Sequence, residues 1–112
     1  MLAMPGEGEP IEGGVSVPDI DKVIHEPARL MIMANLFVLE SADFLFLMNR
    51  TGLTFGNLSS HMKKLEDAGY IEVVKEFVGR KPHTMLRLTM EGRDAFIEYR
   101  RRMGEFLGDI PE

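Results

Sequence analysis

Hydrophobic residues recur along residues 19–109 in patterns that predict four helices and one β-hairpin. Asp19 is expected to cap a short turn. The first long helix is expected from Pro27, which suits a first helical turn, to about Glu40. This helix is apolar on almost every side, so it should lie in a core or between subunits. One fold of this size can hardly cover all of it, which indicates a dimer.

Two further helices are expected on either side of a short turn. Asp43 should cap a brief helix over residues 44–50 that ends at Gly52. Thr54 should open the next helix, which stops at Gly69. Three apolar positions in this helix follow the spacing of one buried face, namely Leu58, Met62 and Leu65.

The C-terminal part predicts a hairpin and a last helix. Residues 70–77 are rich in β-branched and aromatic side chains, as strands are. Residues 79–82 should form the turn and residues 84–89 the second strand. Thr89 should cap a helix whose apolar residues have helical spacing, namely Phe96, Tyr99, Met103, Phe106 and Leu107. The expected fold class is mostly α with a small β-hairpin.

The second and third helices form a candidate helix-turn-helix, in which the later helix would enter the major groove. A glycine turn between helices is a weak signal alone, and the basic hairpin tip that follows strengthens it. Residues 53–71, LTFGNLSSHMKKLEDAGYI, resemble the recognition helix and first wing strand of winged-helix regulators of the MarR/ArsR type. The resemblance continues through FVGRKPHT at residues 77–84, then Leu88-Thr89 and Glu91-Gly92-Arg93.

The resemblance implies a winged helix-turn-helix that binds double-stranded DNA as a homodimer, with terminal helices at the interface. The recognition helix would be residues 54–68 and the wing residues 77–84. At 100° per residue, the face opposite the apolar positions presents small, amide and basic side chains. The residues expected at DNA are Thr54, Gly56, Asn57, Ser59, Ser60, Lys63, Lys64, Arg80 and Lys81. Phe55 departs from the pattern, because a polar residue is more usual there.

Charge and composition adjust this interpretation. The chain of 112 residues has a net charge of -5, but residues 54–93 carry seven basic against five acidic residues. A binding surface experiences the local field over a Debye length of about 10 Å, so overall acidity weakens the DNA hypothesis without excluding it. A winged-helix protein-protein interaction module without sequence-specific DNA binding is the alternative.

Other classes of function find little support. The chain has no cysteine, and His25, His61 and His83 lack metal-ligand spacing. Adjacent serines and His61 cannot face each other on a helix, so we expect no enzyme, no cofactor and no metal. The chain has neither a signal peptide pattern nor a membrane span, so a cytoplasmic protein is expected. Residues 1–18, rich in glycine and proline, should form a disordered or loosely docked tail. Residues 19–109 should form the domain, and no residue identifies a small-molecule effector.

Overall fold

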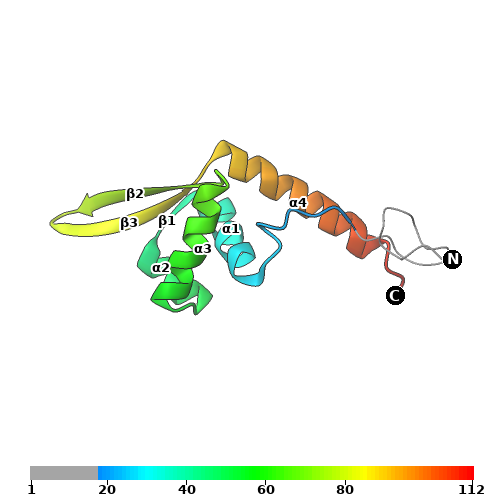
Figure 1. The fold of residues 1–112 in the computed structure, drawn as a ribbon, viewed down its shortest axis with the longest axis horizontal. Coiled ribbons are helices and arrows are strands. Elements are labelled where there is room, and N and C mark those ends of the chain that lie inside the picture. Colours follow the sequence, from blue (N-terminus) through cyan, green and yellow to red (C-terminus); the bar gives the residue numbers. More distant parts are fainter. Residues whose placement is uncertain (1–17) are drawn as a thin grey trace.

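The computed structural model describes residues 18–112, and it confirms the predicted order of helices and hairpin (Figure 1). The elements are α1 (Pro27–Leu39), β1 (Ser41–Asp43), α2 (Phe44–Thr51), α3 (Phe55–Asp67), β2 (Ile71–Val78), β3 (Lys81–Leu88) and α4 (Met90–Gly108). Strand β1 was not predicted. Apart from Pro18, the predicted tail at residues 1–18 lies outside the described residues.

Helix starts follow the predicted caps. The side chains of Asp43, Thr54 and Thr89 each accept hydrogen bonds from backbone N–H groups in the first turn of α2, α3 and α4. Pro27 is the first residue of α1, as expected. These side-chain oxygens satisfy N–H groups that have no partner within the helix, so each cap fixes where its helix begins.

The predicted cap at Asp19 is wrong, because Asp21 has that role. One carboxylate oxygen of Asp21 accepts hydrogen bonds from the backbone N–H groups of Val23, at 2.8 Å, and Ile24, at 3.2 Å. An aspartate reaches amides two and three residues ahead of it, and Asp19 lies too early in the chain for these two. The carboxylate of Asp19 instead lies 3.7 Å from Arg102 on α4.

The strands form one antiparallel sheet in the order β1-β3-β2. Strand β3 pairs with β2 from Ile71↔Leu88 to Val78↔Lys81, so it begins three residues before the predicted position 84. The turn therefore consists of Gly79 and Arg80, and Gly79 takes a φ of 65°, which such tight turns require. The strand includes Pro82 because β1 pairs only with residues 85–87 and leaves that edge of β3 open at the proline.

Strand β1 follows directly from the end of α1. Glu40 ends the helix with a φ of 69°, and its carbonyl accepts a hydrogen bond from the backbone N–H of Leu88 at 2.9 Å. The next residues then pair with β3, and Ala42 lies opposite Leu86. Both of these side chains are buried, so the short strand closes the base of the hairpin over the core.

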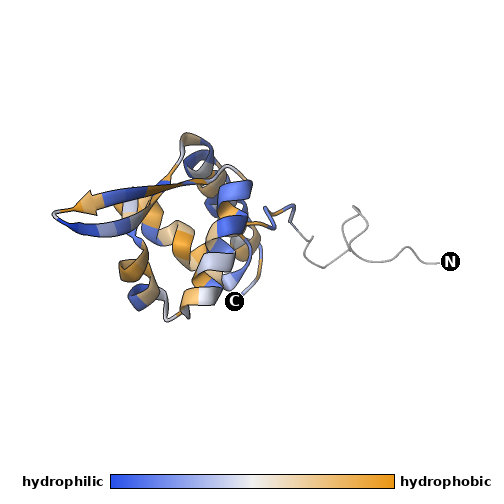
Figure 2. Ribbon diagram, turned by 60° about the vertical axis from the view of Figure 1, so that its left-hand side comes forward, coloured by the Kyte–Doolittle hydropathy of each residue, from blue (hydrophilic) through white to orange (hydrophobic). Residues whose placement is uncertain are grey.

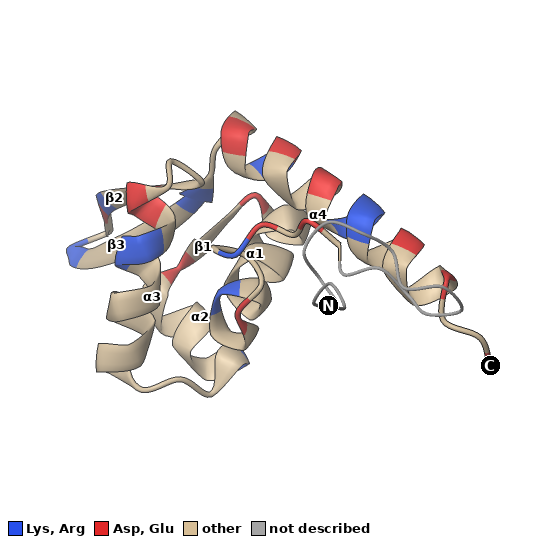
Figure 3. Ribbon diagram, turned by 45° about the vertical axis from the view of Figure 1, so that its right-hand side comes forward, with Lys and Arg blue, Asp and Glu red and all other residues tan. Residues whose placement is uncertain are grey.

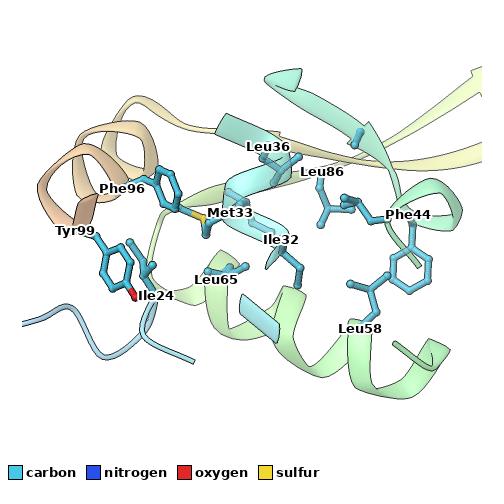
Figure 4. Close-up of a cluster of buried hydrophobic side chains, with 13 residues drawn as sticks. Ile24, Ile32, Met33, Leu36, Phe44, Leu58, Leu65, Leu86, Phe96 and Tyr99 are labelled. Atoms are coloured by element: carbon cyan, nitrogen blue, oxygen red, sulfur yellow. The ribbon is translucent and has the colours of Figure 1, made fainter. Parts of the chain in front are cut away.

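The core is built around α1, whose buried side chains contact those of the other helices and the sheet (Figure 4). Its principal members are Ile24, Ile32, Met33, Leu36, Phe44, Leu58, Leu65, Leu86, Phe96 and Tyr99. The sequence predicted that α1 would be buried in a core or between two subunits. One side of the helix is buried within the single chain. Phe96 and Tyr99 lie in this core, so neither side chain is free to form an interface with a second copy.

Several apolar side chains remain exposed on α1 and α4. They are Met31, Val38 and Leu39 on α1, and Met90, Ile97 and Leu107 on α4. The outer end of strand β2 is also hydrophobic (Figure 2), because Phe77 and Val78 are exposed there. Within residues 18–112, no helix combines the length and apolar character that crossing a bilayer requires.

The start of α4 is fixed against the junction of α3 and β2. Thr89 donates its backbone N–H to the carbonyl of Tyr70 at 3.1 Å and its hydroxyl to the carbonyl of Gly69 at 2.6 Å. Gly92 packs so closely on Tyr70 that an added Cβ would lie 2.8 Å from the Tyr70 carbonyl carbon. From this contact α4 extends away on the side opposite the hairpin (Figure 1).

Candidate nucleic-acid interface

Helix α3 presents one buried and one exposed face, as its sequence predicted. Leu58 and Leu65 are fully buried, and Met62 is half-buried. On the other side, Gly56, Asn57, Ser60, Lys63 and Lys64 are exposed, whereas Ser59 is half-buried. Most of the predicted contact residues of this helix therefore lie together on its exposed side, within about three turns of its N-terminus.

Thr54 and Asn57 have different roles at the start of α3. The Thr54 hydroxyl accepts the backbone N–H of Asn57 at 3.2 Å, so its oxygen is committed to the cap. The Asn57 side chain forms no hydrogen bond within residues 18–112. Its amide therefore keeps both donor and acceptor groups available to a ligand.

The two lysines of α3 differ in their surroundings. Lys63 donates to Asp67 at 2.8 Å, and this hydrogen bond and the aspartate's charge raise the pKa of Lys63. Both side chains are exposed, so the pair can open at little cost. Lys64 forms no ion pair among the described residues and is the stronger candidate for a phosphate contact.

His61 anchors α3 to the start of α1. Its Nδ1 lies 3.1 Å from the Arg29 guanidinium and 3.5 Å from the Glu26 carboxylate. Arg29 also donates to the carbonyl of Val23 at 2.6 Å. The partners of His61 are therefore Arg29 and Glu26, which connect α3 to α1, and not one of the adjacent serines. Among residues 18–112, no group of three or more histidine or acidic side chains is arranged to hold a metal ion.

The hairpin carries the remaining predicted residues and one that the prediction missed. Arg80 and Lys81 are exposed at its tip and form no ion pair within the part of the chain described. Lys75 is likewise exposed and unpaired there. Residues 71, 73 and 75 point to the same face of β2, so Lys75 shares a face with Ile71 and Val73. Near the base of the hairpin, this face packs against the helices. That alternation is visible in the sequence and could have identified Lys75.

The hairpin is tied to the helix-turn-helix by His83 and Asp43. The His83 Nδ1 lies 2.7 Å from one Asp43 carboxylate oxygen, while the other oxygen caps α2 through Leu45 and Phe46. Burial opposes ionisation of Asp43, but the hydrogen bonds from His83 and from these two amides outweigh it and lower the pKa of Asp43. One carboxylate therefore orients both α2 and the wing.

Acidic and basic residues alternate along α4 (Figure 3), and two of its arginines pair with acids of the same helix. Arg101 and Arg102 both bind Glu98, and their hydrogen bonds lower the pKa of Glu98 to about 2. Arg101 also binds Glu105 at 2.6 Å. Arg101 and Arg102 thus contribute little positive field, and Arg100 is the one arginine of α4 without an ion pair among residues 18–112.

Comparisons with known proteins agree with this geometry. The family model described as winged helix DNA-binding domain matches residues 28–107. The uncharacterised protein MJ0432 of Methanocaldococcus jannaschii is 37% identical over 78 residues, which span 70% of this chain and 85% of the relative.

Solved structures show the same fold. A transcriptional regulator homologue from Pyrococcus horikoshii OT3 is 27% identical, with a TM-score of 0.74 over 79% of this chain and 89% of the other. A MarR mutant from E. coli, solved in complex with operator DNA, has a TM-score of 0.64 at 14% identity, over 80% of this chain and 60% of the other. The winged-helix fold and the resemblance to MarR-type regulators are therefore confirmed, and the family supports a DNA-binding regulator.

Proposed function

We propose that this chain, which belongs to the winged helix DNA-binding domain family, is a cytoplasmic transcriptional regulator that binds a palindromic DNA site as a homodimer. Helix α3 enters the major groove and the hairpin contacts the phosphate backbone or the minor groove. The protein acts by occupying DNA and not by catalysis. The observation that carries this proposal is the number of cations without an ion pair among residues 18–112. Helix α3 and the hairpin carry four of them, namely Lys64, Lys75, Arg80 and Lys81, whereas α4 carries one, Arg100.

The proposal gives the contact residues two separate roles. Asn57, Ser59 and Ser60 lie in the first turns of α3, where side chains of a recognition helix meet base edges. Lys63, Lys64 and the wing cations neutralise phosphates, which supplies affinity without sequence information. Gly56 has no Cβ and lets the helix backbone approach the groove, while Thr54 holds the first turn in place.

The homodimer is proposed from the apolar side chains left exposed on α1 and α4. Val38 is 78% exposed, and Ile97 and Leu107 are 49% and 58% exposed. Large apolar patches are uncommon on monomers. In a two-fold symmetric dimer, the apolar side chains of each subunit would be buried against those of the other. Light scattering at micromolar concentration should give the mass of two chains, and a monomer mass would contradict this part of the proposal.

The alternative, a protein-protein interaction module, is favoured by one specific feature. A shallow groove between α1 and α2, of about 340 Å³, is lined by Ala34, Asn35, Val38, Leu39, Phe46 and Arg50. Its apolar lining would suit a partner helix. This groove lies apart from the unpaired cations of α3 and the hairpin, so it does not account for them.

The deciding experiment is selection from a random-sequence duplex library, followed by sequencing of retained DNA. Enrichment of a palindrome would support the regulator, and retention without enrichment, or no retention, would favour the interaction module. For the enriched duplex, Asn57→Ala or Ser60→Ala should cost about 1–3 kcal/mol of binding and change binding to random DNA little. Lys64→Ala should weaken both alike.

A matched pair of double variants tests the wing. Replacing Arg80 and Lys81 with alanine should make the slope of log K against log salt shallower by about one for each lost phosphate contact. Replacing Arg100 and Arg101 with alanine removes the same formal charge from α4 and should leave the slope nearly unchanged. Equal slopes for the two double variants would exclude the hairpin tip from the DNA contact.

A further inference from the structure

The first two turns of α3 contain neither arginine nor lysine. From Thr54 to Met62 the chain carries no basic residue other than His61, which is engaged with Arg29. Arginine or lysine bound to the O6 and N7 atoms of guanine is the commonest specific contact in the major groove. The part of α3 best placed to meet base edges therefore lacks the side chains that select G·C pairs.

Asn57 offers a different chemistry at this point. Its side chain is exposed and has no hydrogen-bond partner in residues 18–112. A carboxamide presents one acceptor and two donors in a plane, which match the N6 and N7 atoms of adenine. The unpaired amide is thus suited to an A·T pair.

Phe55, the first residue of α3, is an apolar residue that is exposed to solvent. The residue is 65% exposed, and its ring packs on that of Phe44 with ring centroids 4.9 Å apart at an interplanar angle of 58°. Phe44 is itself buried, so it fixes the Phe55 ring from beneath and leaves the outer part of the ring free. Among the groups of the major groove, the C5-methyl of thymine is the apolar one, and phenylalanine is among its known contacts.

Gly56 lies between these two side chains in the first turn of α3. Consecutive residues are 100° apart around a helix, so Phe55 and Asn57 lie on the two sides of Gly56, about 160° from each other, at the N-terminal end of α3. A Cβ at Gly56 would meet nothing within 4 Å, so packing within the chain does not demand glycine here. Its absence of a side chain brings the helix surface closer to the bases.

We infer that α3 selects A·T base pairs, with Phe55 contacting the C5-methyl of thymine and Asn57 the N6 and N7 edge of adenine. This inference rests on the proposed function and assigns a role to Phe55, the residue that departs from the usual polar pattern. It predicts that the enriched site has A·T pairs at the positions read by the start of α3.

The test changes the DNA rather than the fold. In the duplex enriched from the random library, each thymine is replaced in turn by deoxyuridine, which removes only the C5-methyl. Binding is measured by fluorescence anisotropy at about 0.15 M salt. Loss of one buried methyl contact should lower affinity about fourfold, and symmetric replacement in both half-sites about 15-fold.

The variants identify the residue that senses the methyl. Phe55→Ala and Phe55→Leu are each compared on the thymine and uracil duplexes, with circular dichroism to verify the fold. The alanine variant should distinguish the two duplexes by less than about twofold, since the apolar contact is gone. Phe46→Ala serves as the matched control, because Phe46 is also an exposed phenylalanine but lies on α2, outside α3 and the hairpin, and it should keep the full preference for thymine.

Two results would overturn the inference while leaving the proposed function intact. One is an enriched palindrome whose affinity changes by less than about twofold for uracil at every thymine. The other is a Phe55→Ala variant that keeps the full thymine preference. Absence of any enriched sequence would instead refute the proposed function, and this inference with it.

Discussion

Replacing Gly92 with alanine is expected to destabilise the fold, whereas the same replacement at Gly104 of the same helix is expected to stabilise it. The new Cβ at position 92 would lie 2.8 Å from the carbonyl carbon of Tyr70, closer still to its oxygen, and 3.0 Å from Leu88 Cδ1. At position 104 it would meet nothing within 4 Å. Because Tyr70 contributes backbone atoms, it cannot yield by changing a rotamer.

The expected magnitudes follow from three effects. Alanine gains about 1 kcal/mol over glycine in a helix, and this gain is common to both variants. Relief of the clash requires α4 to move away from Tyr70, at about 1–3 kcal/mol for overpacking. The movement also strains the hydrogen bond from Thr89 to the Tyr70 carbonyl, worth about 1 kcal/mol. The two variants should therefore differ by about 2–4 kcal/mol, a large part of a total stability of about 5–15 kcal/mol.

Urea unfolding monitored by far-ultraviolet circular dichroism measures this difference directly. Gly104→Ala should unfold at a higher urea concentration than the parent protein and Gly92→Ala at a lower one, with melting temperatures at least about 10 °C apart. Equal midpoints for the two variants would refute the reasoning, because they would mean that α4 does not pack on the Tyr70 carbonyl.

Three further outcomes are expected. Gly56→Ala should stabilise the free protein by about 1 kcal/mol in unfolding measurements, yet weaken binding to the enriched duplex about tenfold. Unchanged affinity would mean that the glycine is not at the DNA. Asp67→Asn should free Lys63 and steepen the salt slope by about one per subunit, and an unaltered slope would remove Lys63 from the phosphate contacts. Asp43→Asn keeps the cap but loses the charge facing His83, so it should cost about 1 kcal/mol at neutral pH. Because folding lowers the pKa of Asp43, that cost should shrink as the pH falls below 3.8 and vanish below the lowered value; a cost that persists in acid would contradict the assignment.

The local features of the fold could be predicted from the sequence because each depends on nearby residues. Thr54 and Thr89 cap their helices through amides three residues ahead, and the buried face of α3 follows from the spacing of Leu58 and Leu65. Strand β1 could not be predicted in this way. Its three residues are too short for an alternating pattern, and its pairing with residues 85–87 joins parts of the chain more than 40 positions apart.

The candidate site shows the same division. The exposed side of α3 and the basic tip of the hairpin follow from helical and strand periodicity. The ion pair between Lys63 and Asp67 has the i, i+4 spacing of helical partners, so it was open to prediction. The contact between His83 and Asp43, and that between Phe55 and Phe44, depend on the packed arrangement of α2 against its neighbours, which periodicity does not specify.

The close contact between Gly92 and Tyr70 sets the direction in which α4 leaves the domain. A helix of 19 residues is about 28 Å long, so a tilt of about 10° at this contact displaces its far end by about 5 Å. That displacement exceeds the 3.4 Å separation of adjacent base pairs. If α4 joins the two subunits, the spacing between half-sites that the dimer accepts is encoded by a glycine far from any base.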